Sequence, residues 1–282
     1  MPVMSERKFI KMHGLGNDFV VLDRRQNGGE VSPALARAVA DRHTGIGCDQ
    51  VIVIGKSVSG LADAELVFFN PDGGTSAACG NGTRCVAALL MGESGADHLV
   101  LETGHGLLDA DSAANGEISV DMGLARTEWR DIPLSQAGDT LHLGIIEGAL
   151  ADPVGVNIGN PHAVFFVEDA DAVDLERLGP RLEHHEIFPE RANIGVAEVR
   201  APDRIRLRVW ERGAGITRAC GSGACAGVVA GVRRQLTGRK VAVELDGGAL
   251  AIEWLENGHV LMTGPVATAF TGEFDASLLE AR

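Results

Sequence analysis

The sequence predicts an α+β protein built from two pseudo-symmetric halves, each a mostly antiparallel sheet wrapped around a central helix. The main evidence is a glycine-rich segment that occurs twice, as ACGNGTRC over residues 78–85 and as ACGSGAC over residues 219–225. The first cysteines of the two copies, Cys79 and Cys220, lie 141 positions apart in a chain of 282 residues. A repeat at half the chain length is typical of a duplicated unit.

Residues outside this segment repeat with nearly the same spacing. Three further pairs lie 141 to 143 positions apart: Phe69 and Trp210, Gly74 and Gly215, and Gly16-Asn17 and Gly159-Asn160. We therefore expect a first half over residues 1–130, carrying Cys79, and a second half over residues 131–266, carrying Cys220. A final strand within residues 267–282 is expected to pair back with the first half.

The first half contains strand signals around two helix signals. Its short apolar or alternating segments predict strands over residues 8–13, 19–22, 51–54, 65–69, 99–102, 106–109 and 118–122. Ser32-Pro33 is typical of an N-cap followed by the first residue of a helix, here ending near Asp41. The run from Thr83 to Met91 is apolar on nearly all sides, which predicts a buried helix, and Gly92 is expected to end it.

The second half repeats this arrangement. Strands are predicted over residues 141–146, 163–167 and 205–210, and helices over residues 174–184 and 224–236. The strand over 205–210 alternates apolar residues with arginine, which is typical of a half-buried strand, and it leads into Glu211-Arg212. Asp246-Gly247 and Asn257-Gly258 predict tight turns between the closing strands.

Composition and charge exclude several classes of partner. The chain has 25 Lys and Arg against 39 Asp and Glu, a net charge of −14, which argues against nucleic-acid or anionic-membrane binding. No apolar stretch approaches the ~20 residues of a membrane span, and residues 1–9 lack the apolar core of a secretory signal. Five cysteines, an odd number, argue against a secreted disulfide framework. We expect a cytoplasmic protein with reduced thiols.

The two cysteines indicate acid–base chemistry. A thiol directly before a helix is near the positive end of the helix dipole, where its pKa can fall from ~8.5 into the range ~3.5–7.5. The glycines allow backbone amides to approach an anion, so Gly80-Asn81 and Gly221-Ser222 are candidates to bind a carboxylate. One cysteine from each half, in a cleft between the halves, would allow proton removal on one face of an amino-acid α-carbon and proton delivery on the other.

A cofactor is not expected for this reaction. Racemisation with pyridoxal phosphate needs a lysine that forms a Schiff base. The chain has four lysines, and none lies in a phosphate-binding motif: Lys8, Lys11, Lys56 and Lys240. The small-molecule substrate is therefore expected to react without a cofactor.

Structural interpretations of the same residues remain open. Cys79 and Cys220 could form a disulfide, and with Cys85 and Cys225 they could bind zinc, although the C-x5-C and C-x4-C spacings are not those of zinc knuckles. We expect no metal, and we expect Cys85 and Cys225 to be core residues. Cys48 fits either packing or a functional role.

Polar residues in turns allow two interpretations as well. Asn17, Asn70, Asn160 and Asn193 each fit a simple turn. The repeated Gly-Asn pair favours a functional role. His162 and Glu211-Arg212 could likewise be structural, but the internal repeat places Glu211-Arg212 opposite Asn70.

Six motifs together resemble the diaminopimelate epimerase family. In chain order they are HGLGNDF at 13–19, GIG at 45–47 with DQ at 49–50, ACGNG at 78–82, GNPH at 159–162, ERGAG at 211–215 and ACGSGAC at 219–225. The set covers nearly the whole chain. The resemblance implies an enzyme that interconverts LL- and meso-diaminopimelate without pyridoxal phosphate, in lysine and peptidoglycan biosynthesis, and that forms a homodimer.

The resemblance also implies roles for single residues. Cys79 would be the proton donor and Cys220 the acceptor, exchanging roles in the reverse direction, while His162 and Glu211 would tune the cysteine pair. The implied substrate-binding residues are Asn17, Gln50, Asn70, Gly80, Asn81, Asn160, Asn193, Glu211, Arg212, Gly221 and Ser222. The departures are mild: Cys48 stands where the family often has no thiol, and Pro71 and Gly74 vary the loop before Cys79.

Two alternatives compete with this interpretation. The first is another two-cysteine racemase, of the proline, hydroxyproline or histidine type, although proline racemases usually carry histidine where Asn81 stands. The second is a redox or ligand-binding protein that has kept the fold. That protein would be expected to have lost one cysteine or the carboxylate-binding turns, and the chain has both.

Overall fold

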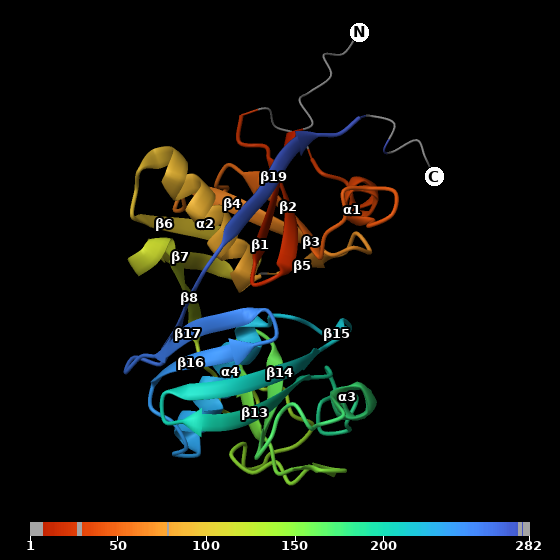
Figure 1. The fold of residues 1–282 in the computed structure, drawn as a ribbon, viewed down its shortest axis with the longest axis vertical. Coiled ribbons are helices and arrows are strands. Elements are labelled where there is room, and N and C mark those ends of the chain that lie inside the picture. Colours follow the sequence, from red (N-terminus) through yellow and green to blue (C-terminus); the bar gives the residue numbers. More distant parts are fainter. Residues whose placement is uncertain (1–7, 27–29, 78, 276–277, 279–282) are drawn as a thin grey trace. The chain divides into compact units, whose positions relative to one another are not determined.

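Figure 1 shows a computed structural model of the chain, which describes residues 8–26, 30–77, 79–275 and 278. Contacts divide the chain into two compact units. Unit 1 comprises the described residues up to Val120 together with those from Pro265 onward, and unit 2 is Asp121–Gly264. Within the described residues, no helix combines the length and the apolar character needed to cross a lipid bilayer.

Unit 1 is a mixed sheet with two helices. Its strands are β1 (Lys8–Gly14), β2 (Asn17–Asp23), β3 (Gln50–Gly55), β4 (Ala64–Phe69), β5 (Thr75–Ser76), β6 (His98–Thr103), β7 (Gly106–Ser112), β8 (Ile118–Leu124), which continues into unit 2, and β19 (Ala267–Glu273). Neighbouring strands are antiparallel except for the parallel pairs β2–β3 and β4–β6. The chain returns at its end, because β19 pairs with β1.

Both predicted helices of unit 1 form, although α2 begins at Gly80, three residues before the predicted start at Thr83. Ser32 caps α1 (Pro33–Ala40) by accepting a hydrogen bond from the Leu35 amide at 3.2 Å. The long helix α2 (Gly80–Ser94) packs against β1, β2, β6 and β7. A short 3-10 turn, η1 (Ala114–Gly116), precedes β8. Contrary to the prediction, α2 passes through Gly92 and ends at Ser94. Gly95 is its C-cap, and the positive φ of 73° lets the Gly95 amide donate to the Met91 carbonyl.

Unit 2 contains a mostly antiparallel arrangement of strands, a separate two-stranded sheet of β9 (Ile146–Glu147) and β10 (Leu150–Ala151), and its own pair of helices. Its other strands are β11 (Val154–Asn157), β12 (Pro161–Val167), β13 (Asn193–Ala201), β14 (Arg204–Glu211), β15 (Gly215–Ile216), β16 (Lys240–Leu245), β17 (Gly248–Trp254) and β18 (His259–Gly264). Its helices are α3 (Leu175–Glu183) and α4 (Gly221–Arg233). The second of these packs against β11 to β14 and β16 to β18, so it is the central helix of the unit.

Two sequence-based predictions in unit 2 are wrong in their bounds. The strand over residues 141–146 does not form; only Ile146 is in a strand, the two-residue β9, and Gly144 with a φ of 68° interrupts the segment. The helix predicted over residues 224–236 instead spans Gly221–Arg233, and Gln235 follows with a φ of 59°.

The two units share one order of elements, which confirms the predicted pseudo-symmetry. In unit 1, α1 connects the parallel strands β2 and β3, and the β4–β5 hairpin leads into α2. In unit 2, α3 connects the parallel strands β12 and β13, and the β14–β15 hairpin leads into α4. The parallel pairs β4–β6 and β14–β16 also correspond (Figure 1). The fold class is therefore α+β with an internal duplication.

A close helix–strand contact in unit 2 gives a stability prediction. A Cβ atom built on Gly179 of α3 would lie 2.5 Å from ring carbons of Trp210 on β14. We expect Gly179→Ala to lower the free energy of unfolding by about 1–3 kcal/mol, because the ring must move. The control is Gly92→Ala in α2, where no atom lies within 4 Å of the added Cβ. Alanine should there raise the stability by about 0.5–1 kcal/mol through helix propensity.

Urea unfolding followed by circular dichroism measures both variants. Gly179→Ala proving as stable as the parent protein would show that Trp210 moves aside at no cost.

Candidate functional site

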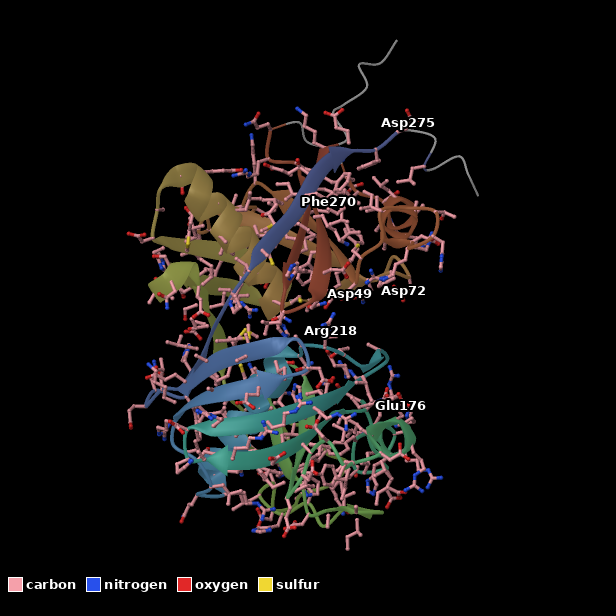
Figure 2. The ribbon with its side chains drawn as sticks, viewed as in Figure 1. Asp49, Asp72, Glu176, Arg218, Phe270 and Asp275 are labelled. Carbon is pink, nitrogen blue, oxygen red and sulfur yellow. The ribbon has the colours of Figure 1, made fainter. Side chains whose placement is uncertain are left out.

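Each unit carries one of the two candidate acid–base cysteines and its own share of the predicted site residues. Unit 1 contains Asn17, Gln50, Asn70, Cys79, Gly80 and Asn81. Unit 2 contains Asn160, His162, Asn193, Glu211, Arg212, Cys220, Gly221 and Ser222. Figure 2 shows the side chains of both units on the ribbon. The structure thus places the candidate residues in two groups on equivalent elements, and we refer to each group as the candidate half-site of its unit.

Cys79 is the N-cap residue of α2, as the sequence predicts. Its backbone is extended, with φ −145° and ψ 107°, and its side chain is half-buried. The carbonyl oxygen of Cys79 accepts two hydrogen bonds from Thr83, one from its backbone amide at 2.8 Å and one from its hydroxyl at 3.0 Å. Gly82 is required by close packing, since a Cβ there would lie 2.8 Å from Ile52 and 2.9 Å from Phe68.

Amide side chains surround Cys79 in unit 1. The Asn17 Oδ1 atom accepts a hydrogen bond from Asn81 Nδ2 at 3.2 Å and lies 4.0 Å from the Cys79 sulfur, at the long end of a thiol hydrogen bond. Gln50, the first residue of β3, donates from Nε2 to Asn70 Oδ1 at 2.9 Å. The structure therefore joins Cys79, Asn17 and Asn81 in one group, and Gln50 and Asn70 in another.

Cys220 is the N-cap residue of α4 and is only 3% exposed. Its sulfur accepts a hydrogen bond from the Gly223 amide at 3.3 Å, and Ser222 Oγ lies 3.7 Å away. The expectation that the helix end lowers the pKa of this thiol is wrong. Burial raises the pKa of Cys220 well above its ordinary value, and the negative charge of Glu211 raises it further. The thiol is therefore held in its protonated form.

Glu211 is the charged group that acts on Cys220. It ends β14 and accepts a short hydrogen bond from the Thr217 hydroxyl. Its carboxylate also accepts a hydrogen bond from the Cys220 thiol, which is one of the reasons that the pKa of Cys220 is high. The Cys220 sulfur therefore has two partners, the Glu211 carboxylate and the Gly223 amide.

His162 is neutral and acts as a hydrogen-bond donor. Its ring lies fully buried on β12, where Nε2 is 2.8 Å from Asn160 Oδ1 and 3.1 Å from Ser222 Oγ. Because the amide oxygen of Asn160 can only accept, Nε2 carries the proton. Burial lowers the pKa of His162 to about 3, with a smaller contribution from the positive charge of Arg212. His162 thus orients Asn160 and Ser222 and does not act as a cation.

Asn193 links two backbone segments of the half-site. It starts β13 and is 2% exposed. Its Nδ2 donates to the Pro161 carbonyl at 3.0 Å, and its Oδ1 accepts from the Arg212 backbone amide at 2.9 Å. The Arg212 side chain itself donates from Nη1 to the Glu190 carbonyl at 2.8 Å. Asn193 therefore fixes the backbone on which Arg212 stands.

Glu183 is a residue of this half-site that the sequence analysis did not identify. It ends α3 and is 3% exposed. Its carboxylate accepts from Trp210 Nε1 at 2.7 Å, the Gly213 amide at 3.1 Å and Arg191 Nη1 at 3.2 Å. Two of these donors flank Glu211-Arg212. One local signal was present: a carboxylate at the negative end of a predicted helix is unfavourable unless it has partners elsewhere.

The remaining thiols are core residues. All five cysteines lie within the described ranges, and none of them forms a disulfide, so the alternative of a Cys79–Cys220 disulfide is wrong. Cys48 is 2% exposed in the core of unit 1 and Cys85 is fully buried, and burial raises the pKa of each to about 12. Cys225 is also fully buried in α4. Packing is thus the role that the structure supports for Cys48, which the sequence left open.

Comparison with known proteins places this arrangement in a family. Residues 9–128 and 154–269 match the family described as diaminopimelate epimerase. The chain is similar to a diaminopimelate epimerase of Rhodospirillum centenum, with 59% identity over 273 residues, 97% of this chain and 94% of the relative. It is 53% identical to one of Acidiphilium cryptum over 275 residues, 98% of this chain and 99% of the relative.

Similarity in fold extends further than similarity in sequence. The crystal structure of a phenazine biosynthesis protein of the PhzF family from Bacillus anthracis superposes with a TM-score of 0.69 at 16% identity, covering 96% of this chain and all of that one. With its duplicated topology, its two N-cap cysteines and its match over nearly the whole length, the chain belongs to the diaminopimelate epimerase family.

Proposed function

We propose that this protein is an epimerase that interconverts LL-2,6-diaminopimelate and meso-diaminopimelate, with Cys79 and Cys220 as its two acid–base groups. The observation that carries the proposal is the equivalence of the two thiols. Each is the N-cap of the central helix of its unit, and the two units have the same topology. Relatives at 53–59% identity carry the name of this activity.

The reaction needs one group on each face of the α-carbon. In one direction, Glu211 takes the Cys220 proton, and the thiolate then removes the α-proton of the substrate. The carbanion receives a proton from the Cys79 thiol on the opposite face, which leaves Cys79 as the thiolate. In the reverse direction the two cysteines exchange roles. Each sulfur must come within about 3–3.5 Å of its reacting atom, so the sulfurs would be roughly 6–7 Å apart when substrate lies between them.

Other residues would bind the two ends of the substrate. The backbone amides of Gly80-Asn81 and Gly221-Ser222, at the N-termini of α2 and α4, suit the carboxylate beside the reacting carbon. The proposed partners of the distal amino-acid end are Asn17, Gln50, Asn70, Asn160, Asn193 and Arg212. Arg212 offers the positive charge and paired donors that a carboxylate needs.

The biological setting is part of the same proposal. It places the protein in the cytoplasm, as a homodimer, in the synthesis of lysine and peptidoglycan precursors, without a metal or an organic cofactor. This setting follows from the resemblance to the family and from the net charge of −14.

Proton NMR in D₂O tests the function directly. The reduced protein is incubated with LL-diaminopimelate and, separately, with proline, histidine and lysine. We expect loss of the α-proton signal and appearance of the meso isomer with diaminopimelate alone. Exchange on proline or histidine instead would keep the two-thiol chemistry and reject the substrate. No exchange on any of the four, with both thiols free, would favour a binding protein.

A further inference from the structure

Asp49 connects an ion-pair network to the amide of Asn17 in unit 1. Asp49 directly precedes β3 and is labelled in Figure 2. Its Oδ2 accepts hydrogen bonds from Asn17 Nδ2 at 2.8 Å and from the Asp18 amide at 3.0 Å. Its Oδ1 accepts from Arg42 Nη2 at 2.6 Å. The carboxylate is therefore held on both sides, with Asn17 as one of its partners.

The carboxylate of Asp49 decides which way the Asn17 amide faces. An ionised carboxylate only accepts hydrogen bonds, so the NH₂ group of Asn17 must point toward it. The Asn17 oxygen then points the other way, where it meets Asn81 Nδ2 at 3.2 Å and the Cys79 sulfur at 4.0 Å. A reversed amide would set two NH₂ groups against each other at Asn81 and two oxygens against each other at Asp49. Asp49 thus fixes Asn17, and Asn17 in turn fixes Asn81.

We propose that Asp49 is a positioning residue for Cys79: it keeps the Asn17 oxygen turned toward the sulfur, where only the protonated thiol can donate to it. The catalytic importance of this arrangement rests on the proposed function, because a protonated Cys79 is the form that delivers a proton to the carbanion. The orientation itself depends only on contacts within unit 1.

Neighbouring charges keep Asp49 in place. Arg42 bridges Asp49 and Asp18, reaching Asp18 Oδ1 at 2.7 Å, and Lys11 Nζ bonds Asp18 Oδ2 at 2.5 Å. The Asp49 amide also donates to Asp18 Oδ1 at 3.0 Å. Although burial opposes its ionisation, hydrogen bonds from Arg42 and Lys11 hold the pKa of Asp18 well below its usual range. Asp18 therefore remains charged.

The helix that Cys79 caps, α2, carries two buried titratable groups. They are Arg84 and Cys85, both fully buried, and burial raises the pKa of Cys85 to about 12. Neither Arg84 nor Cys85 changes when Asp49 is replaced.

Alkylation of Cys79 by iodoacetamide tests the inference without any substrate. The full-length protein is labelled from about pH 6 to about pH 10, the range in which thiols ionise, and Cys79 is quantified by peptide mass spectrometry. In Asp49→Asn the Asn17 amide is free to turn. We expect Cys79 to react about 3- to 10-fold faster near neutral pH, the size of one hydrogen bond, because the thiolate is the reactive form. The rates should converge at high pH, where all of the thiol is ionised.

Two further variants control the experiment. Strand β2 begins at Asn17 and ends at Asp23, which pairs with Arg25 at 2.6 Å. Asp23→Asn therefore removes a carboxylate from the far end of the strand that carries Asn17, and Cys79 in this variant should be labelled at the rate of the parent protein. In an Asn17→Ala background, Asp49→Asn should change the labelling rate no further, since Asp49 is proposed to act through Asn17.

Three outcomes would overturn the inference. Equal labelling of Asp49→Asn and the parent protein at every pH would show that Asp49 does not affect the thiol. A labelling rate that is higher in Asp49→Asn by the same factor at every pH would mean that the substitution exposes the Cys79 sulfur and does not change its ionisation. An undiminished effect in the Asn17→Ala background would mean that Asp49 acts through its charge. If the labelling follows the expectation and diaminopimelate is not epimerised, the proposed function fails while the positioning role of Asp49 stands.

Discussion

Replacing Cys220 with alanine is expected to lower the rate of diaminopimelate epimerisation by about 10²–10⁴-fold, and replacing Cys79 should have an effect of the same order. General acid–base groups contribute factors of this size. The reason is geometric: each variant keeps one acid–base group and lacks the other, so a proton can be exchanged on only one face of the α-carbon.

The single-cysteine variants also allow a sharper test than loss of activity. The remaining thiolate can still remove an α-proton from the isomer that faces it and return a deuteron from D₂O to the same face. We therefore expect each variant to exchange the α-proton of one isomer without inversion, and the two variants to act on opposite isomers. Exchange of both isomers by one variant would contradict the assignment of one cysteine to each face.

The chain offers matched controls for both substitutions. Cys225 and Cys85 are fully buried thiols on the same two helices, α4 and α2. Cys225→Ala and Cys85→Ala are expected to keep most of the activity, with at most a small loss of stability. A loss as large as that of Cys220→Ala would mean that the substitutions act through the fold.

Replacing Glu183 with glutamine is expected to lower the free energy of unfolding by about 1–3 kcal/mol, the cost of leaving a buried donor without an acceptor. The three donors to Glu183 are Trp210 Nε1, the Gly213 amide and Arg191 Nη1. The NH₂ group of glutamine must face at least one of them. Glu183→Gln should also raise the KM for diaminopimelate, because the turn that carries Arg212 lies between two of these donors.

Urea unfolding followed by tryptophan fluorescence measures this loss in the right unit, since Trp129, Trp210 and Trp254 all lie in unit 2. The control is Glu147→Gln, which breaks a partly exposed pair with Arg181 at 3.0 Å. Such a pair is worth about 0–1 kcal/mol. Equal losses of unfolding free energy in Glu183→Gln and Glu147→Gln would show that the buried hydrogen bonds of Glu183 stabilise the protein no more than an exposed ion pair does.

Local chemistry accounts for the elements that the sequence placed well. Ser32 and Asp174 are N-caps because their side chains accept from amides three residues on, and Asp246-Gly247 forms the two-residue turn between β16 and β17. The errors arose where more than one local choice was available. Gly92 and Gly95 could both end α2, and the helix continues through exposed residues to Ser94, with Gly95 as its C-cap.

The sequence by itself determined the duplication, the place of Cys79 and Cys220 at the starts of equivalent helices, and the family. These depend on residue types at short spacing. Only the tertiary structure decided the protonation of the Cys220 thiol and the partners of Asp49 and Glu183. The helix end was expected to lower the pKa of Cys220, but burial raises it. The free-energy cost of removing the thiolate from water is larger than the stabilisation that the hydrogen bond from the Gly223 amide provides. Asn17 and Asp49, or Glu183 and Trp210, lie about thirty positions apart, so no local pattern reveals that they meet.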